Sequence, residues 1–164
     1  MKIRTLRFRI LSSAGVRLSK AKLVKLIESD EIKSWRLLMS AFQSVYGQLE
    51  KGLAEKDVSV PRFQVLFYLY FEGRASASAL SRKLLVTRSN MSMFLKRMES
   101  DGLIKFDIPM GQKRPGIELT PKGNKFFEEL FPEHAARVTK MVHSFAPQTL
   151  KDLEKIRRRV SSNP

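Results

Sequence analysis

The side chains best suited to a chemical task lie in a basic stretch near the middle of the chain. Its members combine short polar groups with cations: Thr87, Arg88, Ser89, Asn90, Ser92, Met93, Lys96 and Arg97. Arginine and lysine bond to guanine edges or phosphates, short polar side chains allow close approach to base edges, and an apolar group suits the methyl of thymine. The chemistry indicated by these types is recognition of DNA.

Two further pairs of residues extend the same chemistry. Ser76 and Ser78 stand at the start of a predicted helix, where hydroxyls and free backbone amides together can hydrogen-bond a phosphate. Lys113 and Arg114 are adjacent cations in a segment rich in turn residues. Taken singly, each of these residues also suits an ordinary solvated surface, so the interpretation depends on the elements that carry them.

Basic charge is concentrated in particular stretches. Residues 1–25 hold eight basic residues and no acidic one, and residues 74–97 hold six and none. A third cluster, Arg157 to Arg159, we interpret as a solvated face, the usual meaning of a charge run. The middle stretch is long and lies among predicted elements, which favours a docking surface.

Capping signals place this surface on a helix-turn-helix. A mostly apolar, central helix is predicted over residues 60–71, opened by a serine cap and a first-turn proline and ended by a glycine. A short helix over residues 76–85 follows, and after a turn at Val86 a second helix covers residues 88–100. The second helix of such a pair presents its amino-terminal half to the major groove of DNA.

A β-hairpin is predicted directly after this second helix. Its strands cover residues 103–108 and 117–119, and the loop between them carries Lys113 and Arg114 at its tip. Within the second helix, the inward positions are Met91, Met98 and either Phe94 or Leu95. The predicted fold is therefore mainly α with a small β-hairpin, a winged helix-turn-helix.

Long amphipathic helices flank this region. Residues 33–53 predict a helix of about six turns whose apolar stripe faces more than one neighbour. A second long helix starts at Pro121 and carries apolar residues to Phe145, with Pro132 expected to bend or divide it. A last helix is expected over residues 150–160, and a short one over residues 20–27.

The composition of the whole chain excludes several functions. Its 164 residues suit one domain with helical ends, and a formal net charge of +15 implies a polyanionic partner, nucleic acid before an anionic membrane surface. The absence of cysteine excludes thiolate metal sites and cysteine nucleophiles. His134 and His143 are too far apart to share a metal, so we expect no metal, no cofactor and no enzymatic activity. The longest apolar run is far below the roughly 20 residues of a membrane span, and a cytoplasmic location is expected.

Five short stretches form a specific combination by their order and spacing: Pro61–Leu66, Ala79–Leu84, Val86–Ser92, Glu99–Ile104 and Leu119–Gly123. Together they resemble the MarR family of bacterial transcriptional regulators, over residues 58–160. The resemblance implies a homodimer that binds pseudo-palindromic DNA. It also implies that the first long helix and the last two helices intertwine with the partner subunit as dimerisation helices.

The chain departs from the family's pattern at two places. The wing usually carries an aspartate and, two residues later, an arginine that enters the minor groove, whereas these positions hold Gly111 and Lys113 here, followed by Arg114. Whether Lys113 or Arg114 enters the groove stays open. Met93 occupies a position of the recognition helix that often carries arginine, and the absence of cysteine excludes the peroxide-sensing branch.

These features divide the chain into four parts: a basic extension over residues 1–32, a dimerisation helix over residues 33–57, a winged helix-turn-helix DNA-binding domain over residues 58–120, and dimerisation helices over residues 121–164. We interpret the protein as a sequence-specific regulator that binds double-stranded DNA. The alternatives are a sequence-indifferent, nucleoid-type DNA-binding protein and a winged-helix module that binds an acidic protein.

The sequence leaves the operator, the regulated genes, the sign of regulation and any small-molecule effector open. Five aromatic residues are candidates for an effector pocket, although packing in the core is their expected role: Trp35, Phe42, Tyr46, Phe67 and Tyr70.

Overall fold

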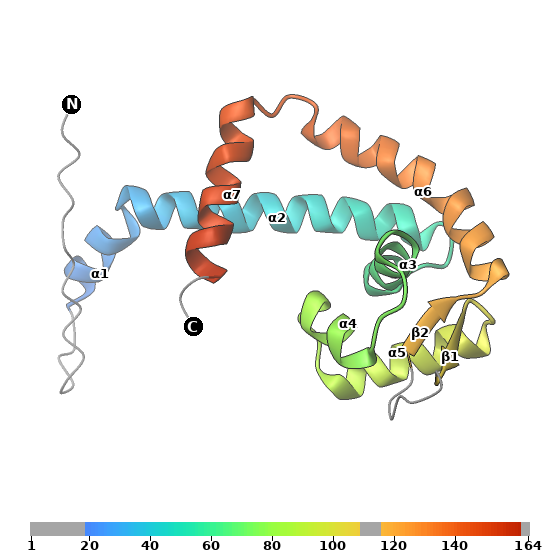
Figure 1. Cartoon of the computed structure of the whole chain (residues 1–164). Helices are drawn as coiled ribbons and strands as arrows, with labels where there is room; N and C mark the ends of the chain where they lie inside the picture. The colour runs from blue at the N-terminus through green and yellow to red at the C-terminus, as the bar shows by residue number, and fades with distance from the viewer. Residues whose placement is uncertain (1–18, 109–115, 162–164) are drawn as a thin grey trace. The chain divides into compact units, whose positions relative to one another are not determined.

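The computed structural model describes residues 19–108 and 116–161 (Figure 1). The described elements follow in the order α1 (Lys20–Ile27), α2 (Asp30–Ala54), α3 (Val60–Glu72), α4 (Ala77–Leu84), α5 (Arg88–Ser100), β1 (Ile104–Asp107), β2 (Gly116–Leu119), α6 (Pro121–Val142) and α7 (Pro147–Ser161). The prediction of a mainly helical chain with one small hairpin is confirmed. Within the described ranges, no helix is long and apolar enough to span a membrane.

The chain divides into two units, residues 1–42 and residues 43–164, and the boundary falls inside α2. In the first unit, α1 buries no side chain. Trp35 is 59% exposed and Phe42 is 57% exposed. These two aromatic residues therefore lie outside the core of the described residues, contrary to the expectation from the sequence.

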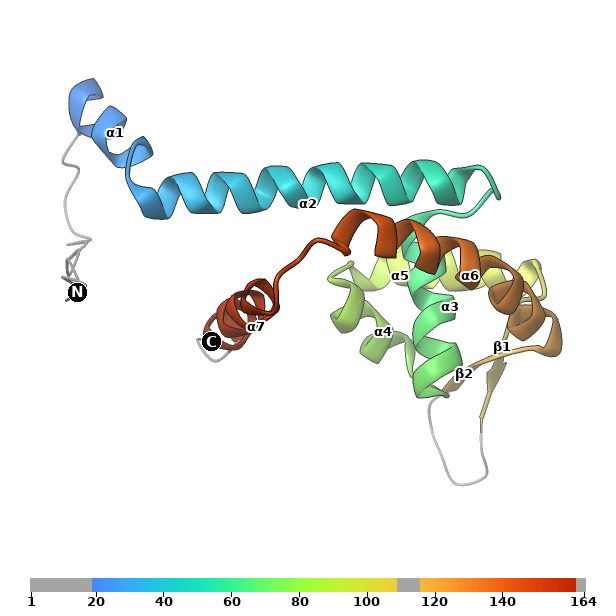
Figure 2. The same cartoon turned by 90° about the horizontal axis from the view of Figure 1, so that it is seen from above.

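Helix α3 is the centre of the second unit, as its apolar composition predicts. Val65 and Leu66 are fully buried, and α3 packs against α4, α6 and β2 (Figure 2). Helices α4, α5 and α6 and both strands also contribute to this core, with fully buried side chains at Leu80, Met91, Leu95, Met98, Ile104, Ile117 and Phe127. In α5 the third inward position is Leu95, whereas Phe94 is only half-buried.

Capping residues are present at the ends of the central elements. Ser59, Thr87 and Thr120 each accept a hydrogen bond from a backbone N–H in the first turn of the helix that follows. Gly73 and Gly102 adopt positive φ angles of 79° and 70°, the left-handed region that suits glycine after a helix. The residues around the functional elements thus determine where those elements begin and end.

The last two helices follow the sequence predictions only in part. Pro132 lies inside α6, which continues to Val142 without division, because a proline removes one backbone hydrogen bond while the turns on both sides keep theirs. Helix α7 begins at Pro147, three residues before the predicted start, since proline is favoured in the first turn. All the large apolar side chains of α7 remain exposed: Leu150, Leu153, Ile156 and Val160.

A close contact joins the start of α6 to the end of α5. The Thr120 hydroxyl donates to the Gly102 carbonyl at 2.6 Å, and the Thr120 N–H donates to the Leu103 carbonyl at 3.0 Å. A Cβ added at Gly123 would overlap that same Leu103 carbonyl oxygen. Glycine at position 123 therefore allows the backbone of α6 to approach the segment that leads into β1.

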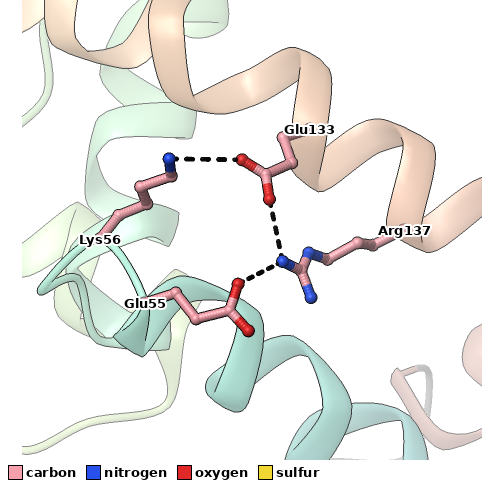
Figure 3. A network of polar contacts seen from close by, with 4 residues as sticks. All are labelled: Glu55, Lys56, Glu133 and Arg137. Atoms are coloured by element: carbon pink, nitrogen blue, oxygen red, sulfur yellow. Dashed lines mark hydrogen bonds and ion pairs between the residues drawn. The ribbon is translucent and has the colours of Figure 1, made fainter.

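A network of exposed charges joins α6 to the end of α2 (Figure 3). Arg137 donates to Glu55 at 2.5 Å and to Glu133 at 2.9 Å, and Lys56 lies 3.7 Å from Glu133. The hydrogen bond from Arg137, followed by the charge of Lys56, holds the pKa of Glu133 below its ordinary value. Because these side chains are exposed, the network contributes little to stability but fixes which groups lie together.

His134 lies beside this network and contacts the core. Its ring centroid is 3.9 Å from that of Phe63 on α3. Burial, and secondly the charge of Arg137, lower the pKa of His134. The neutral imidazole is therefore the form that suits this position.

Candidate nucleic-acid interface

The turn between α4 and α5 is built by a buried serine and a strained leucine. Ser81 is almost fully buried, and its hydroxyl donates to the Val86 carbonyl at 2.7 Å, while the Val86 N–H donates to the Ser81 carbonyl at 3.2 Å. Leu85 adopts a φ of 53°, in the left-handed region, and is 92% exposed. Thr87 then caps α5 by accepting from the Asn90 N–H at 3.2 Å. These contacts set the position of α5 relative to α4.

Helix α5 has one buried face and one exposed face. Met91, Leu95 and Met98 are fully buried. The predicted contact residues on the helix are all exposed: Arg88, Ser89, Asn90, Ser92, Met93, Lys96 and Arg97. The structure thus places these seven side chains outward on a single helix.

The six cations between residue 74 and residue 97 form two groups, which differ in whether an ion pair with an acidic side chain is present. Lys83 pairs with Glu72 and lies 4.5 Å from the centroid of the Tyr68 ring, and Arg74 pairs with Asp107 and Glu118. The other four cations have no acidic partner in the described part of the chain: Arg82, Arg88, Lys96 and Arg97. Charges without such partners remain available to a polyanion.

The serines at the start of α4 lie together. The Ser76 hydroxyl oxygen accepts from the Ala79 N–H at 3.2 Å and lies 3.1 Å from the Ser78 hydroxyl oxygen. Both residues are half-buried. Capping occupies an acceptor position of Ser76 and leaves its proton for donation, so a phosphate contact remains compatible with the cap.

The hairpin is held to the helices at its base. Strands β1 and β2 pair antiparallel, with Ile104 opposite Leu119. Ala75 exchanges two backbone hydrogen bonds with Ile117, at 3.1 and 2.8 Å. The predicted wing-tip residues, Lys113 and Arg114, lie outside the described residues.

Sequence reasoning missed Arg74 as a structural residue of the wing. Its guanidinium donates to the Asp107 carbonyl at 2.5 Å and lies 3.4 Å from the Asp107 carboxylate. A Cβ at Gly116 would overlap this guanidinium. A glycine opposite an aspartate at the loop end of the predicted hairpin is the signal that could have indicated it.

Arg62 and Asp101 are a second missed pair. The Arg62 guanidinium, on α3, donates to the Asp101 carboxylate at 2.6 Å, and the Lys122 ammonium donates to the Asp101 carbonyl at 2.7 Å. The residue that follows α5 is therefore tied to both α3 and α6. Sequence spacing gives no signal for this pair, because the residues are 39 positions apart.

Comparison with known proteins identifies a matching family model and a related regulator. A model described as MarR family matches residues 56–113. The HTH-type transcriptional regulator MhqR of Bacillus subtilis is 22% identical over 133 residues, which make up 80% of this chain and 92% of that protein. The helix-turn-helix and the first strand of the hairpin lie inside the matched residues.

Solved structures show the same fold. AbsC, a MarR family transcriptional regulator from Streptomyces coelicolor, matches with a TM-score of 0.73 and 20% identity, over 90% of this chain and 97% of that one. A mutant of MarR from E. coli, complexed with operator DNA, matches with a TM-score of 0.67 and 19% identity, over 80% of this chain and 95% of that one. The chain therefore has the winged-helix fold of these proteins.

Proposed function

Because the chain belongs to the MarR family of transcriptional regulators, which is not a family of enzymes, we propose that it binds a pseudo-palindromic operator sequence-specifically as a homodimer. The observation that carries this proposal is the exposed face of α5. That face presents polar side chains together with Arg88, Lys96 and Arg97, which lack acidic partners in the part of the chain that the structure describes. A helix with such a face suits the width of the major groove.

The proposed contacts divide by their distance from the start of α5. Arg88, Ser89, Asn90 and Ser92 lie in its first two turns, where base edges are accessible to an inserted helix. Lys96 and Arg97 lie further along and are assigned to phosphates. Thr87, Ser76 and Ser78 add hydroxyl groups at helix starts, and either Lys113 or Arg114 is assigned to the minor groove beside the wing.

The homodimer is supported by apolar surface that stays exposed among the described residues. On α2, Leu37 is 72% exposed, and on α7, Val160 is 69% exposed. Soluble proteins seldom leave extended apolar helix faces in water unless another surface covers them. We assign α2, α6 and α7 to the subunit interface, and we place the protein in the cytoplasm, where its DNA partner lies.

Selection of bound fragments from a random duplex library, followed by competition with bulk genomic DNA, tests the function. A regulator is expected to prefer its selected site by about a thousandfold or more. A sequence-indifferent, nucleoid-type protein would bind all fragments alike, and a protein-interaction module would not bind random DNA even at low salt. Either result would overturn the proposal.

Light scattering tests the oligomeric state. The full chain is expected to be a dimer at micromolar concentration, and removing the residues after Pro147 should shift it toward monomer, because α7 supplies apolar interface. The full chain with Lys151 and Lys155 replaced by glutamine is a control that alters charge on α7 but keeps its apolar face. A stable monomer with full DNA binding would contradict the dimer.

A further inference from the structure

The exposed face of α5 has a central line that differs chemically from its edges. Ser89, Met93 and Lys96 follow one another at spacings of four and three residues, so they form one stripe along the helix. By the same periodicity this stripe lies opposite the buried Met91 and Leu95. Met93 therefore stands at the middle of the face that an inserted helix turns toward base edges.

Met93 is an exposed apolar residue among polar and charged neighbours. It is 46% exposed, and within α5 it is the one large apolar side chain with more than a third of its surface in water. Its neighbours on the exposed face are Ser89, Ser92, Lys96 and Arg97. Its exposed apolar surface is available to a partner that approaches this face.

The two arginines of the helix lie to the sides of this central line. Arg88 and Arg97 are nine residues apart, which places them on opposite flanks of a helix with 3.6 residues per turn. The first half of the central line consists of Ser89 and Met93. Neither can form the bidentate contact with guanine that arginine or lysine forms. The methyl group of thymine is the apolar feature of the major groove that a polarizable thioether can cover.

We propose that Met93 is a specificity-determining residue that selects an A·T pair in each half-site by contact with the thymine methyl group. This inference rests on the proposed function, because it assigns α5 to the major groove. It adds the identity of a base pair and the group on it that is read. A second protein chain covering Met93 is the competing occupant, and the test separates the two.

The experiment replaces thymine by deoxyuridine, which removes only the methyl group, at each thymine of the selected operator in turn. Wild-type protein is expected to lose affinity at one symmetric position by about fourfold per half-site, the effect of uncovering one methyl-sized group. Met93→Ala should bind the thymine and deoxyuridine operators equally. Met93→Leu should keep the sensitivity, and Glu99→Gln, an exposed change elsewhere on the same helix, should leave it intact.

The outcomes are distinguishable. If the protein prefers its operator but is insensitive to deoxyuridine at every position, or if Met93→Ala keeps the full loss, the role of Met93 is wrong while the proposed function stands. If the protein shows no operator preference, the proposed function fails and this inference fails with it. A Met93→Ala variant that binds DNA normally but loses self-association would assign Met93 to a protein interface instead.

Discussion

Arg88 is the first residue of α5, where an inserted helix reaches base edges. Lys96 and Arg97 lie further along the helix and are assigned to phosphates. Replacing Arg88 by alanine is expected to cost about 1–3 kcal/mol of operator binding and to relax the preference at one half-site position, because a base contact is lost. Replacing Lys96 or Arg97 should weaken operator and random DNA by similar factors. Affinities of the three variants for both DNAs, at one salt concentration, measure this difference. Equal weakening of both DNAs by Arg88→Ala would make Arg88 a phosphate contact.

Protonation of His134 is expected to destabilise the folded chain. Burial and the nearby Arg137 hold its pKa below the ordinary value of 6.5, so the unfolded chain binds this proton more readily than the folded chain. The contribution of His134 to the unfolding free energy is therefore complete above about pH 6.5 and falls as the pH drops through the lower pKa of the folded state. The pKa of neighbouring Glu133 is lowered from an ordinary value of 4.5, so its loss of stability comes at lower pH.

Urea unfolding at a series of pH values measures the effect of His134. His134→Phe keeps an aromatic ring beside Phe63 but cannot bind a proton, so its stability should fall less between pH 6.5 and pH 5. His143→Phe, a change at the exposed end of α6, is the matched control and should behave like the wild type. A His134→Phe variant that loses stability as steeply as the wild type would contradict the assignment.

Single residues also show how far the sequence predicts the fold. Ser59, Thr87, Thr120 and Gly102 mark helix ends through local backbone chemistry, and each was predictable because its partners lie within a few positions. The pairings of Arg62 with Asp101 and of Arg74 with Asp107 were not, because they join distant segments. The choice of Leu95 over Phe94 likewise depends on which neighbours pack against α5.

At the scale of elements, the contact between α6 and the end of α5 determines how the hairpin is attached. Gly123→Ala is expected to destabilise the chain by about 1–3 kcal/mol, because its Cβ would overlap the Leu103 carbonyl oxygen. Gly47→Ala, on α2, meets no atom within 4 Å and should stabilise by about 0.5–1 kcal/mol through helix propensity alone. Denaturant unfolding of both variants compares them. A Gly123→Ala variant as stable as Gly47→Ala would show that α6 can withdraw at no cost.

The part of the candidate surface that lies on α5 alone was predictable from the sequence. All seven predicted side chains of α5 are exposed, since periodicity assigns them to the face opposite its apolar positions. The partners that neutralise Arg74 and Lys83 lie on other elements, so an acid-free stretch of sequence does not distinguish free cations from paired ones. The start of α7 was misjudged because a proline can begin a helix.

At the scale of the whole molecule, the basic residues at the amino terminus are expected to add to DNA binding. Residues 1–25 hold eight basic residues and no acidic one. If two or three of them reach phosphates in each subunit, deleting residues 1–19 should flatten the slope of log affinity against log salt by about 4 to 5 units per dimer. Operator preference should persist, because phosphate contacts carry no sequence information. Titrations of full-length and truncated protein at several salt concentrations measure the slope, and an unchanged slope would exclude these residues from the interface.

Three cations of α4 and α5 also affect the rate at which the protein associates with DNA. Arg82, Lys96 and Arg97 have no acidic partner in the described ranges, so their field extends toward any duplex within about 10 Å at moderate ionic strength. Such attraction raises the association rate and lets a protein slide along non-specific DNA before it reaches its site. An operator within a long fragment should therefore be found faster than the same operator in a short one. These charges shorten the search, whereas the polar and apolar groups of α5 determine the residence time.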